Sequence, residues 1–291
     1  MDNIKGSSGP DLVTGTINLV TAAENTYSPS DVVDGGAGTD TLQITIGATA
    51  ATGVAGTLQT ILPTQQAVET VRIINVDSAN APASGTHTFN ANSMTGLVTA
   101  EVSSSSKPAN FSNLANASVK LSAASNTAAV DFGIKTTALT GSADTVSLAL
   151  SSNTGGVTVN NTGAGIEALD LTVSGSNTGV LMGAAADLKT VTIGGTGTIT
   201  IGSSDLTAVT KLDASANSGA VNYAATAVNS TVMGGSGADT LTGSTGNDTI
   251  MGGAGADSII AGAGNDSVDA GAGNDTVTLQ AGVNKNDTIA G

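Results

Sequence analysis

A nine-residue repeat near the C-terminal end limits the folds that this chain can adopt. Five copies follow one another without a gap, starting at Gly234, Gly243, Gly252, Ala261 and Ala270. Each copy is a six-residue glycine-rich segment followed by three residues whose middle member is Leu, Ile or Val. The glycines favour a turn and the aliphatic triplet favours a strand. One aliphatic side chain per copy is too little for an independent core, so the copies must stack into coils.

An aspartate occupies the sixth position of every copy: Asp239, Asp248, Asp257, Asp266 and Asp275. If two copies make one coil, alternate aspartates stand above one another in two columns. Neighbouring coils are about 4.8 Å apart. Two bare carboxylates about 5 Å apart repel by roughly 3 kcal/mol at an effective dielectric constant near 20. The columns therefore predict a counter-ion between the coils.

A hard divalent cation fits this arrangement, because carboxylate oxygens and turn carbonyls give an all-oxygen environment that suits Ca²⁺. We expect several Ca²⁺ ions as the cofactor. The alternative, that the aspartates only form turns, does not account for their unbroken spacing of nine. The glycines expected to leave the carbonyls accessible are Gly235, Gly237, Gly246, Gly253, Gly255, Gly262, Gly264, Gly271 and Gly273.

The same motif recurs near the N-terminus as GGAGTDTLQ from Gly35, with a weaker copy, GSSGPDLVT, from Gly6. These copies are about 29 residues apart, so a regular roll is not expected. The acidic segment SPSDVVD precedes the first of them. We interpret the region as a calcium-binding cap whose candidate ligand residues are Asp11, Asp31, Asp34, Gly36, Gly38 and Asp40.

The region between the two motifs predicts strands. Alternation of apolar and polar residues, as at Leu169, Leu171 and Val173, has the period of two that strands show. Similar segments recur with a period of about 20, and they begin at Val68, Met94, Leu114, Ile166, Leu188 and Leu206. The sequence therefore predicts an all-β chain: an N-terminal calcium-binding cap (1–46), a parallel β-solenoid (47–233) and a C-terminal β-roll (234–291).

Composition narrows the partners. The formal charge is −15, which disfavours binding to nucleic acid and anionic lipid. The chain has 39 Gly, no Cys and no Trp, so it has no disulfide framework. No run of about 18 apolar residues predicts membrane insertion, and the N-terminal sequence does not resemble a cleaved signal peptide.

No catalytic constellation is evident, and we expect no enzyme. His87 is the single histidine and has no Cys partner for a zinc site. A β-helix polysaccharide lyase would need a basic catalytic residue, for which Arg72 and scattered lysines are the candidates. Each of these reads better as an isolated solvated charge.

The repeats resemble the calcium-binding repeat GGxGxDxUx of RTX proteins, in which U is a large apolar residue. The order of segments, with SDVVDGGAGTDTLQ, then a Thr/Ala/Val/Gly-rich region containing VETV and IEAL, then the repeat block, is similar to the C-terminal assembly region of Caulobacter-type RTX surface-layer proteins. The resemblance implies a secreted, cell-surface protein that leaves by type I secretion, folds on calcium outside the cell and assembles with itself into a lattice. It also implies lipopolysaccharide or another surface component as a partner.

Two other functions remain open from the sequence. The chain could be a calcium-stabilised adhesin or a binding module of a biofilm matrix, which an exposed aromatic cluster would favour. The third reading is the lyase, which would require a deep groove lined by Arg72 and a lysine.

Overall fold

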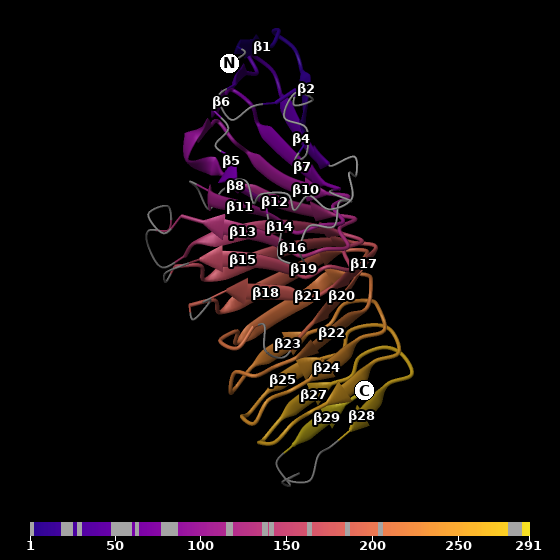
Figure 1. Cartoon of the computed structure of the whole chain (residues 1–291). Coiled ribbons are helices and arrows are strands. Elements are labelled where there is room, and N and C mark those ends of the chain that lie inside the picture. The colour runs from indigo at the N-terminus through magenta and orange to yellow at the C-terminus, as the bar shows by residue number, and fades with distance from the viewer. Residues whose placement is uncertain are drawn as a thin grey trace, which may run out of the picture. The chain divides into compact units, whose positions relative to one another are not determined.

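The computed structural model shows a chain built from strands and turns (Figure 1). It describes residues 3–18, 26–27, 31–47, 60–61, 64–76, 87–114, 119–135, 139, 143–161, 165–183, 187–202, 206–278 and 287–291. Within these residues the one helical element is a 3₁₀ turn, η2 (Ala91–Ser93). No helix in the described residues has the length and apolar character needed to cross a membrane.

The chain divides into two compact units. Unit 1 comprises Met1–Ala138 and Asn153–Asn160, and unit 2 comprises Leu139–Ser152 and Asn161–Gly291. Every strand pairing that is described in either unit is parallel, as expected for a solenoid in which each coil adds one strand to each sheet.

Unit 1 contains parts of three parallel sheets. The longest holds β2 (Leu12–Asn18), β4 (Thr41–Gly47), β7 (Thr70–Asn75), β10 (Thr99–Ser103) and β12 (Lys120–Ala124). A second holds β1 (Asn3–Lys5), β3 (Val32–Asp34), β6 (Thr64–Gln66) and β9 (Met94–Thr95). The third holds β5 (Thr60–Ile61), β8 (His87–Asn90), β11 (Ala109–Leu114), β13 (Val130–Ile134) and β15 (Val157–Asn161), whose last residue belongs to unit 2.

Unit 2 contains two long rows of strands. One row holds β14 (Thr145–Ser151), β16 (Ala168–Ser174), β19 (Thr190–Gly195), β21 (Lys211–Asn217), β23 (Thr231–Met233), β25 (Thr249–Met251), β27 (Ser267–Asp269) and β29 (Thr288–Ala290). The other holds β17 (Ser176–Thr178), β20 (Thr198–Ile201), β22 (Val221–Ala224), β24 (Thr240–Thr242), β26 (Ser258–Ile260) and β28 (Thr276–Thr278). β18 (Val180–Gly183) lies outside both rows.

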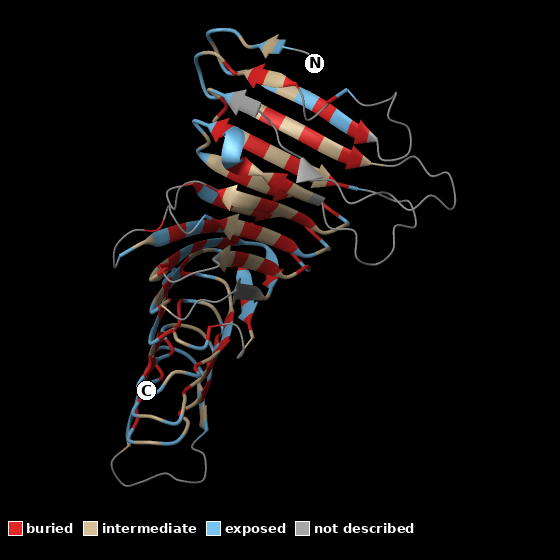
Figure 2. Cartoon of the chain, turned by 60° about the vertical axis from the view of Figure 1, so that its left-hand side comes forward, coloured by how far each residue is buried: buried red, intermediate tan, exposed pale blue. Residues whose placement is uncertain are grey.

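The core of each unit is a set of aliphatic rows that the strand period produces. In β4 the residues Leu42, Ile44 and Ile46 are fully buried, while the residues between them are half-buried. Figure 2 shows the same alternation as bands of red and tan along the strands. In unit 1 three phenylalanines from successive coils, Phe89, Phe111 and Phe132, stack with ring centroids 6.1 Å apart. All five aromatic side chains of the protein are buried.

A polar ladder turns one corner of the coils in unit 1. Asn75, Ser105, Asn126 and Asn153 are at most 1% exposed. The Asn126 side chain accepts a hydrogen bond from the Ser105 N–H at 2.9 Å and donates to Asn153 Oδ1 at 2.9 Å. Asn153 in turn donates to the Ala123 carbonyl at 2.6 Å. These amides satisfy backbone groups that a bend in the strands leaves without a sheet partner.

The length of a coil changes along the chain. Thr41 pairs with Thr70 and Thr70 with Thr99, which gives 29 residues per coil. In the repeat block Thr231 pairs with Thr249 and Thr249 with Ser267, which gives 18. The predicted all-β parallel solenoid is confirmed, and all six predicted strand segments contain a strand of the long sheets. The strands of the repeat block share both rows of unit 2 with strands that precede residue 234.

Candidate metal centre

The repeat aspartates lie at the turns of the roll. Asp239, Asp248, Asp257 and Asp266 are only 1–2% exposed, and Asp275 is half-buried. Each one directly precedes a short strand, so its side chain is held at the point where the turn becomes the strand. Buried carboxylates need compensating partners, because removing a charge from water is costly.

The structure arranges these aspartates in the two predicted columns. In the first, the N–H of Asp239 donates to Asp257 Oδ1 at 2.8 Å, and the N–H of Asp257 donates to Asp275 Oδ1 at 2.9 Å. The column begins with the N–H of Val221, which donates to Asp239 Oδ1 at 2.7 Å. Each carboxylate is thus tied to the backbone 18 residues earlier, one full coil away.

The second column follows the same rule. The N–H of Ser230 donates to Asp248 Oδ1 at 2.6 Å, and the N–H of Asp248 donates to Asp266 Oδ1 at 3.0 Å. The N–H of Asp266 then donates to Asp287 Oδ1 at 2.9 Å, 21 residues later. A degenerate copy around Asp287, which the sequence indicates in GVNKNDTIA, therefore completes this column.

The columns are electrostatically unfavourable without a cation. Burial is the main cause that raises the pKa of Asp239, Asp257 and Asp266. Backbone N–H donors lower each pKa, but the next carboxylate in the column raises it further. The folded roll therefore disfavours the ionised form of these side chains, as the repulsion argument predicts.

The first glycine of a repeat makes room for two kinds of oxygen. A β-carbon on Gly252 would collide with both the Asp257 carboxylate and the carbonyl of Ala270 in the next coil. The same pair of oxygens, the aspartate five residues on and a carbonyl one coil away, surrounds Gly234 and Gly243. Bare α-carbons therefore leave carboxylate and carbonyl oxygens facing the same space.

The remaining repeat glycines have two different roles. Positive φ angles, between 88° and 150°, are found at Gly253, Gly255, Gly262, Gly264, Gly271 and Gly273, and Gly36 and Gly38 share this conformation. Gly235, Gly237 and Gly246 do not have positive φ, and a β-carbon there would collide with the backbone of the preceding coil. Stacking distance, rather than φ, requires those three glycines.

Ser244 replaces the second glycine of its repeat without disturbing the turn. Its N–H donates to Asp248 Oδ2 at 2.6 Å, and its hydroxyl donates to the same oxygen at 2.9 Å. Ser7 makes the same contacts to Asp11 in the weak N-terminal copy, at 2.6 and 3.1 Å. The segments GSSGPD and GSTGND therefore form the same turn, although they are more than 200 residues apart.

The N-terminal copies form a column of their own in unit 1. The N–H of Asp11 donates to Asp40 Oδ1 at 2.8 Å, and the N–H of Asp40 donates to Glu69 Oε2 at 2.7 Å. Glu69 was not among the expected ligands. The signal for it was present, because Asp11, Asp40 and Glu69 are each 29 residues apart, and Asp40 and Glu69 both precede a threonine and an aliphatic residue.

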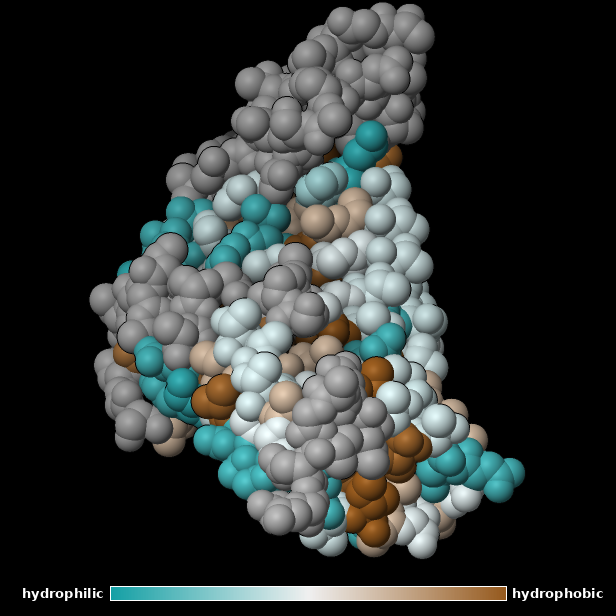
Figure 3. All heavy atoms as spheres, turned by 90° about the horizontal axis from the view of Figure 1, so that it is seen from below, coloured by the Kyte–Doolittle hydropathy of each residue, from teal (hydrophilic) through white to brown (hydrophobic). Residues whose placement is uncertain are grey.

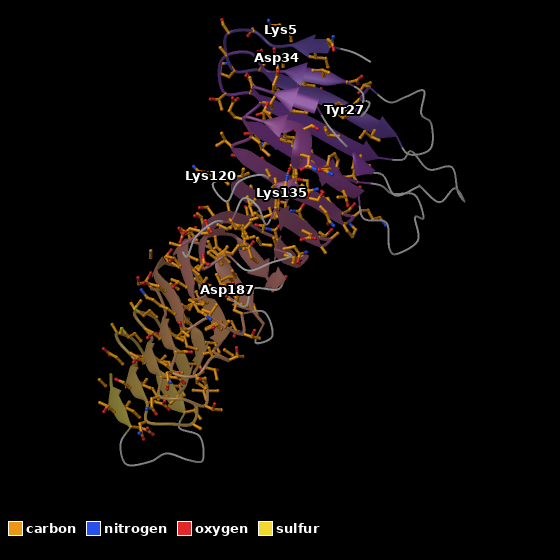
Figure 4. All side chains as sticks on the ribbon, turned by 90° about the vertical axis from the view of Figure 1, so that its left-hand side faces the viewer. Lys5, Tyr27, Asp34, Lys120, Lys135 and Asp187 are labelled. Atoms are coloured by element: carbon orange, nitrogen blue, oxygen red, sulfur yellow. The ribbon has the colours of Figure 1, made fainter. Side chains whose placement is uncertain are left out.

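Asp31 and Asp34 lie apart from this column, on the strand before the turn. Asp34 ends β3, where its register partners are Lys5 and Gln66. Figure 4 labels Lys5 and Asp34 on neighbouring strands. The Asp34 carboxylate accepts hydrogen bonds from the Gly36 N–H and the Gln66 amide, both at 3.1 Å. Asp31 is 3% exposed, and its charge contributes, after burial, to raising the pKa of Tyr27.

A shorter version of the carboxylate contact occurs in unit 2 before the repeats. The N–H of Asp144 donates to Glu167 Oε2 at 2.7 Å, as Asp40 does to Glu69. Both glutamates belong to the segments VETV and IEAL that the sequence places ahead of strands. These acidic residues are therefore equivalents of the repeat aspartate.

The donor set fits calcium if backbone oxygens take part. No three Asp, Glu, His or Cys side chains among the described residues converge on one point that could hold a metal. Each turn instead supplies one carboxylate next to a carbonyl of the neighbouring coil. Asp257 Oδ2 is buried and accepts no hydrogen bond from the described residues, so it is available as a ligand. Calcium accepts such mixed carboxylate and carbonyl oxygens, and when bound it would supply the missing positive charge.

Residues considered for catalysis do not form a site. Arg72 is not an isolated solvated charge, because its Nε lies 3.0 Å from Glu101 Oε1 and its Nη1 donates to Gln43 Oε1 at 3.4 Å. These three residues are register partners on β4, β7 and β10. The contact is a pairing of outward side chains across coils. His87 begins β8.

Comparison with protein-family models finds one match. The model described as the RTX calcium-binding nonapeptide repeat (4 copies) matches residues 30–43 and the overlapping segments 226–259, 233–268, 242–277 and 251–289. Comparison with curated proteins finds no match. The chain thus carries repeats of the RTX calcium-binding type at both of the places where the structure forms carboxylate columns around Asp40 and Asp257.

Proposed function

We propose that this protein is a secreted structural protein that folds on calcium outside the cell and assembles with itself into a surface layer or a related extracellular array. In the cytoplasm, where calcium is scarce, the columns repel and the repeats stay unfolded. Outside the cell, calcium at the concentrations of weak extracellular sites, about 10⁻⁴ to 10⁻³ M, folds them. Repeats of this type are typical of secreted proteins, which supports the location.

The observation that carries the proposal is the pair of carboxylate columns in the roll. They are buried, their pKa values are raised, and carbonyl oxygens of the next coil lie beside them. Such an arrangement gains stability from a cation and loses it without one. Binding and folding are therefore the same event in this part of the chain.

The open edges of the sheets support self-assembly. β28 and β29 are the last strands of their rows, so one side of each offers unpaired backbone groups. Ile289 on β29 is 46% exposed. Figure 3, which views the molecule from below, shows hydrophobic atoms at the surface. A second copy of the chain could pair with these edges, and lipopolysaccharide or another surface component would then anchor the array.

Two other functions have less support. A glycan-binding adhesin would need exposed aromatic rings, but Tyr27, Tyr223 and the three phenylalanines are all at most 2% exposed. A lyase would need a free basic residue, but Arg72 is paired with Glu101. We therefore propose a structural role and no catalytic one.

Electron microscopy of the purified protein with and without calcium tests the proposal. We expect ordered sheets or filaments only with calcium, and dispersed, partly unfolded chains in chelator. Monomers that persist at millimolar calcium, although circular dichroism shows a calcium-induced gain of strand, would favour the binding module. Assemblies that form equally well in strong chelator would contradict the calcium-dependent mechanism.

A further inference from the structure

We propose that unit 1 holds a calcium site of its own in which Glu69, a residue outside every nonapeptide repeat, supplies the closing carboxylate opposite Asp40. The inference rests on the proposed calcium-dependent function. It goes beyond that function because the family match ends at residue 43, and the segment QQAVET around Glu69 contains no glycine.

The first argument is that Glu69 has the backbone position of a repeat aspartate. In the roll, the residue after each acid donates its N–H to the carbonyl of the acid one coil earlier, as Thr276 does to Asp257 at 2.8 Å. Thr70, which follows Glu69, donates in the same way to the Asp40 carbonyl at 2.9 Å. The glutamate therefore occupies the next level of the column.

The second argument is that the side chains match as well. Glu69 Oε2 accepts the Asp40 N–H at 2.7 Å, and Asp275 Oδ1 accepts the Asp257 N–H at 2.9 Å. The glutamate has one more methylene than aspartate, which lets its carboxylate reach this position from a turn of different sequence. Its charge thus stands where the repeats place a calcium ligand.

The third argument comes from the oxygens around Gly35. A β-carbon on Gly35 would collide with the Asp40 carboxylate and the carbonyl of Ala67, just as one on Gly252 would collide with Asp257 and the Ala270 carbonyl. Ala67 takes a φ of 50°, a left-handed conformation that is uncommon for a residue with a side chain. The backbone of the glycine-free turn thus brings a carbonyl to the place where the roll has one.

The fourth argument is an unpartnered oxygen directed at this space. Asp40 is 2% exposed, and its Oδ2 is buried without a hydrogen-bond partner among the described residues. Asp257 has the same exposure and the same unpartnered Oδ2. A buried carboxylate oxygen without a donor is costly, and a cation held jointly with Glu69 would remove that cost.

Hydrogen exchange of the full chain, followed by mass spectrometry across a calcium titration, tests this site. Calcium alone is the ligand. In the unchanged protein, calcium should slow exchange in β4 and β7 of unit 1 as well as in the strands of the roll. The Glu69→Gln variant keeps an oxygen that can accept the Asp40 N–H but removes the charge. We expect its calcium midpoint for β4 and β7 to rise about tenfold or more, with the midpoint of the roll unchanged.

Two variants serve as controls. Glu101→Gln removes the same charge from the next coil of unit 1, where Glu101 pairs with Arg72, and should leave both midpoints unchanged. Asp257→Asn should raise the midpoint of the roll and leave that of unit 1 unchanged. If Glu69→Gln does not fold, Asp40→Asn replaces it with the same expected shift.

The outcomes separate this inference from the proposed function. If calcium protects the roll but not β4 and β7, or if Glu69→Gln leaves the unit 1 midpoint unchanged, the site at Glu69 is wrong and the function stands. If calcium protects neither region, the proposed function itself fails.

Discussion

Each column aspartate combines a structural role with a metal-binding role. One carboxylate oxygen accepts an N–H from the preceding coil, and a second oxygen faces the turn, as Asp257 shows. The first contact favours stacking with or without a metal. The buried charge opposes stacking unless a cation is present. Substitutions that separate the two roles therefore test the account residue by residue.

Replacing Asp257 with asparagine should weaken the response to calcium while keeping the hydrogen bond. The amide oxygen can still accept the Asp239 N–H, but the negative charge is gone. We expect the thermal midpoint without calcium to stay the same or rise, and the increase on adding calcium to become smaller. Asp269→Asn is the matched control, because Asp269 is exposed on β27 of the same roll. An unchanged calcium-induced increase in Asp257→Asn would contradict the role of this carboxylate.

Filling the space beside a column should have a similar effect. A β-carbon in Gly252→Ala would meet the Asp257 carboxylate and the Ala270 carbonyl, and Gly252 has no positive φ that would add backbone strain. We expect calorimetric calcium binding to lose affinity in this variant. Gly194→Ala in β19 is the control, because its β-carbon would meet only Ala216 at 3.9 Å. Equal calcium affinity in both variants would argue against the proposed oxygen pair.

The raised pKa values predict an unusual pH dependence in calcium-free buffer. Asp239, Asp257 and Asp266 have an ordinary value of 3.8 that folding raises, mainly by burial. Their stabilising contribution is therefore fully present below 3.8 and is lost as the pH rises through the raised values. Without calcium, the free energy of unfolding of the roll should be lower at about pH 7 than at about pH 4. Urea titrations followed by hydrogen exchange in β24 to β27 measure it, and a free energy that increases with pH would contradict the prediction.

At the scale of one strand, the roll depends on very few apolar contacts. Each short strand buries one aliphatic residue, such as Ile250, Ile259 and Val268, whereas β4 buries three. Ile259→Ala should therefore cost about 2–4 kcal/mol of the free energy of unfolding in saturating calcium. Met251→Ala is the control, because Met251 is 40% exposed on the neighbouring strand β25. Equal losses in urea titrations of the two variants would show that this row is not the core.

The sequence predicts these elements well where the repeat is regular. The spacing of nine places Asp239 and Asp257 in one column and Asp248 in the other, as found. Asp31 and Asp34 were assigned by proximity to the motif, but their strand β3 lies in a different sheet from β4, which follows the turn. Glu69 was missed because a glutamate in a turn without glycine can occupy the level of an aspartate, which only the backbone pairing reveals.

At the scale of the whole chain, calcium should affect the regions to different extents. The repeat block has the narrowest core and the most column aspartates, whereas unit 1 has the phenylalanine stack and the buried asparagine ladder. Limited proteolysis in chelator should therefore cleave first within residues 234–278, while β10 to β13 stay intact. Mass spectrometry of the fragments identifies the cleavage sites. Simultaneous loss of both regions would show that the coils unfold as one.

The most direct test of the central claim is a crystal structure of the calcium-bound protein with anomalous scattering data. The account predicts anomalous peaks between successive turns, beside the carboxylates of Asp239, Asp257 and Asp275 and of Asp248 and Asp266, with carbonyl oxygens completing each ligand set. A roll wound as described here, with no metal beside any of these carboxylates, would contradict it.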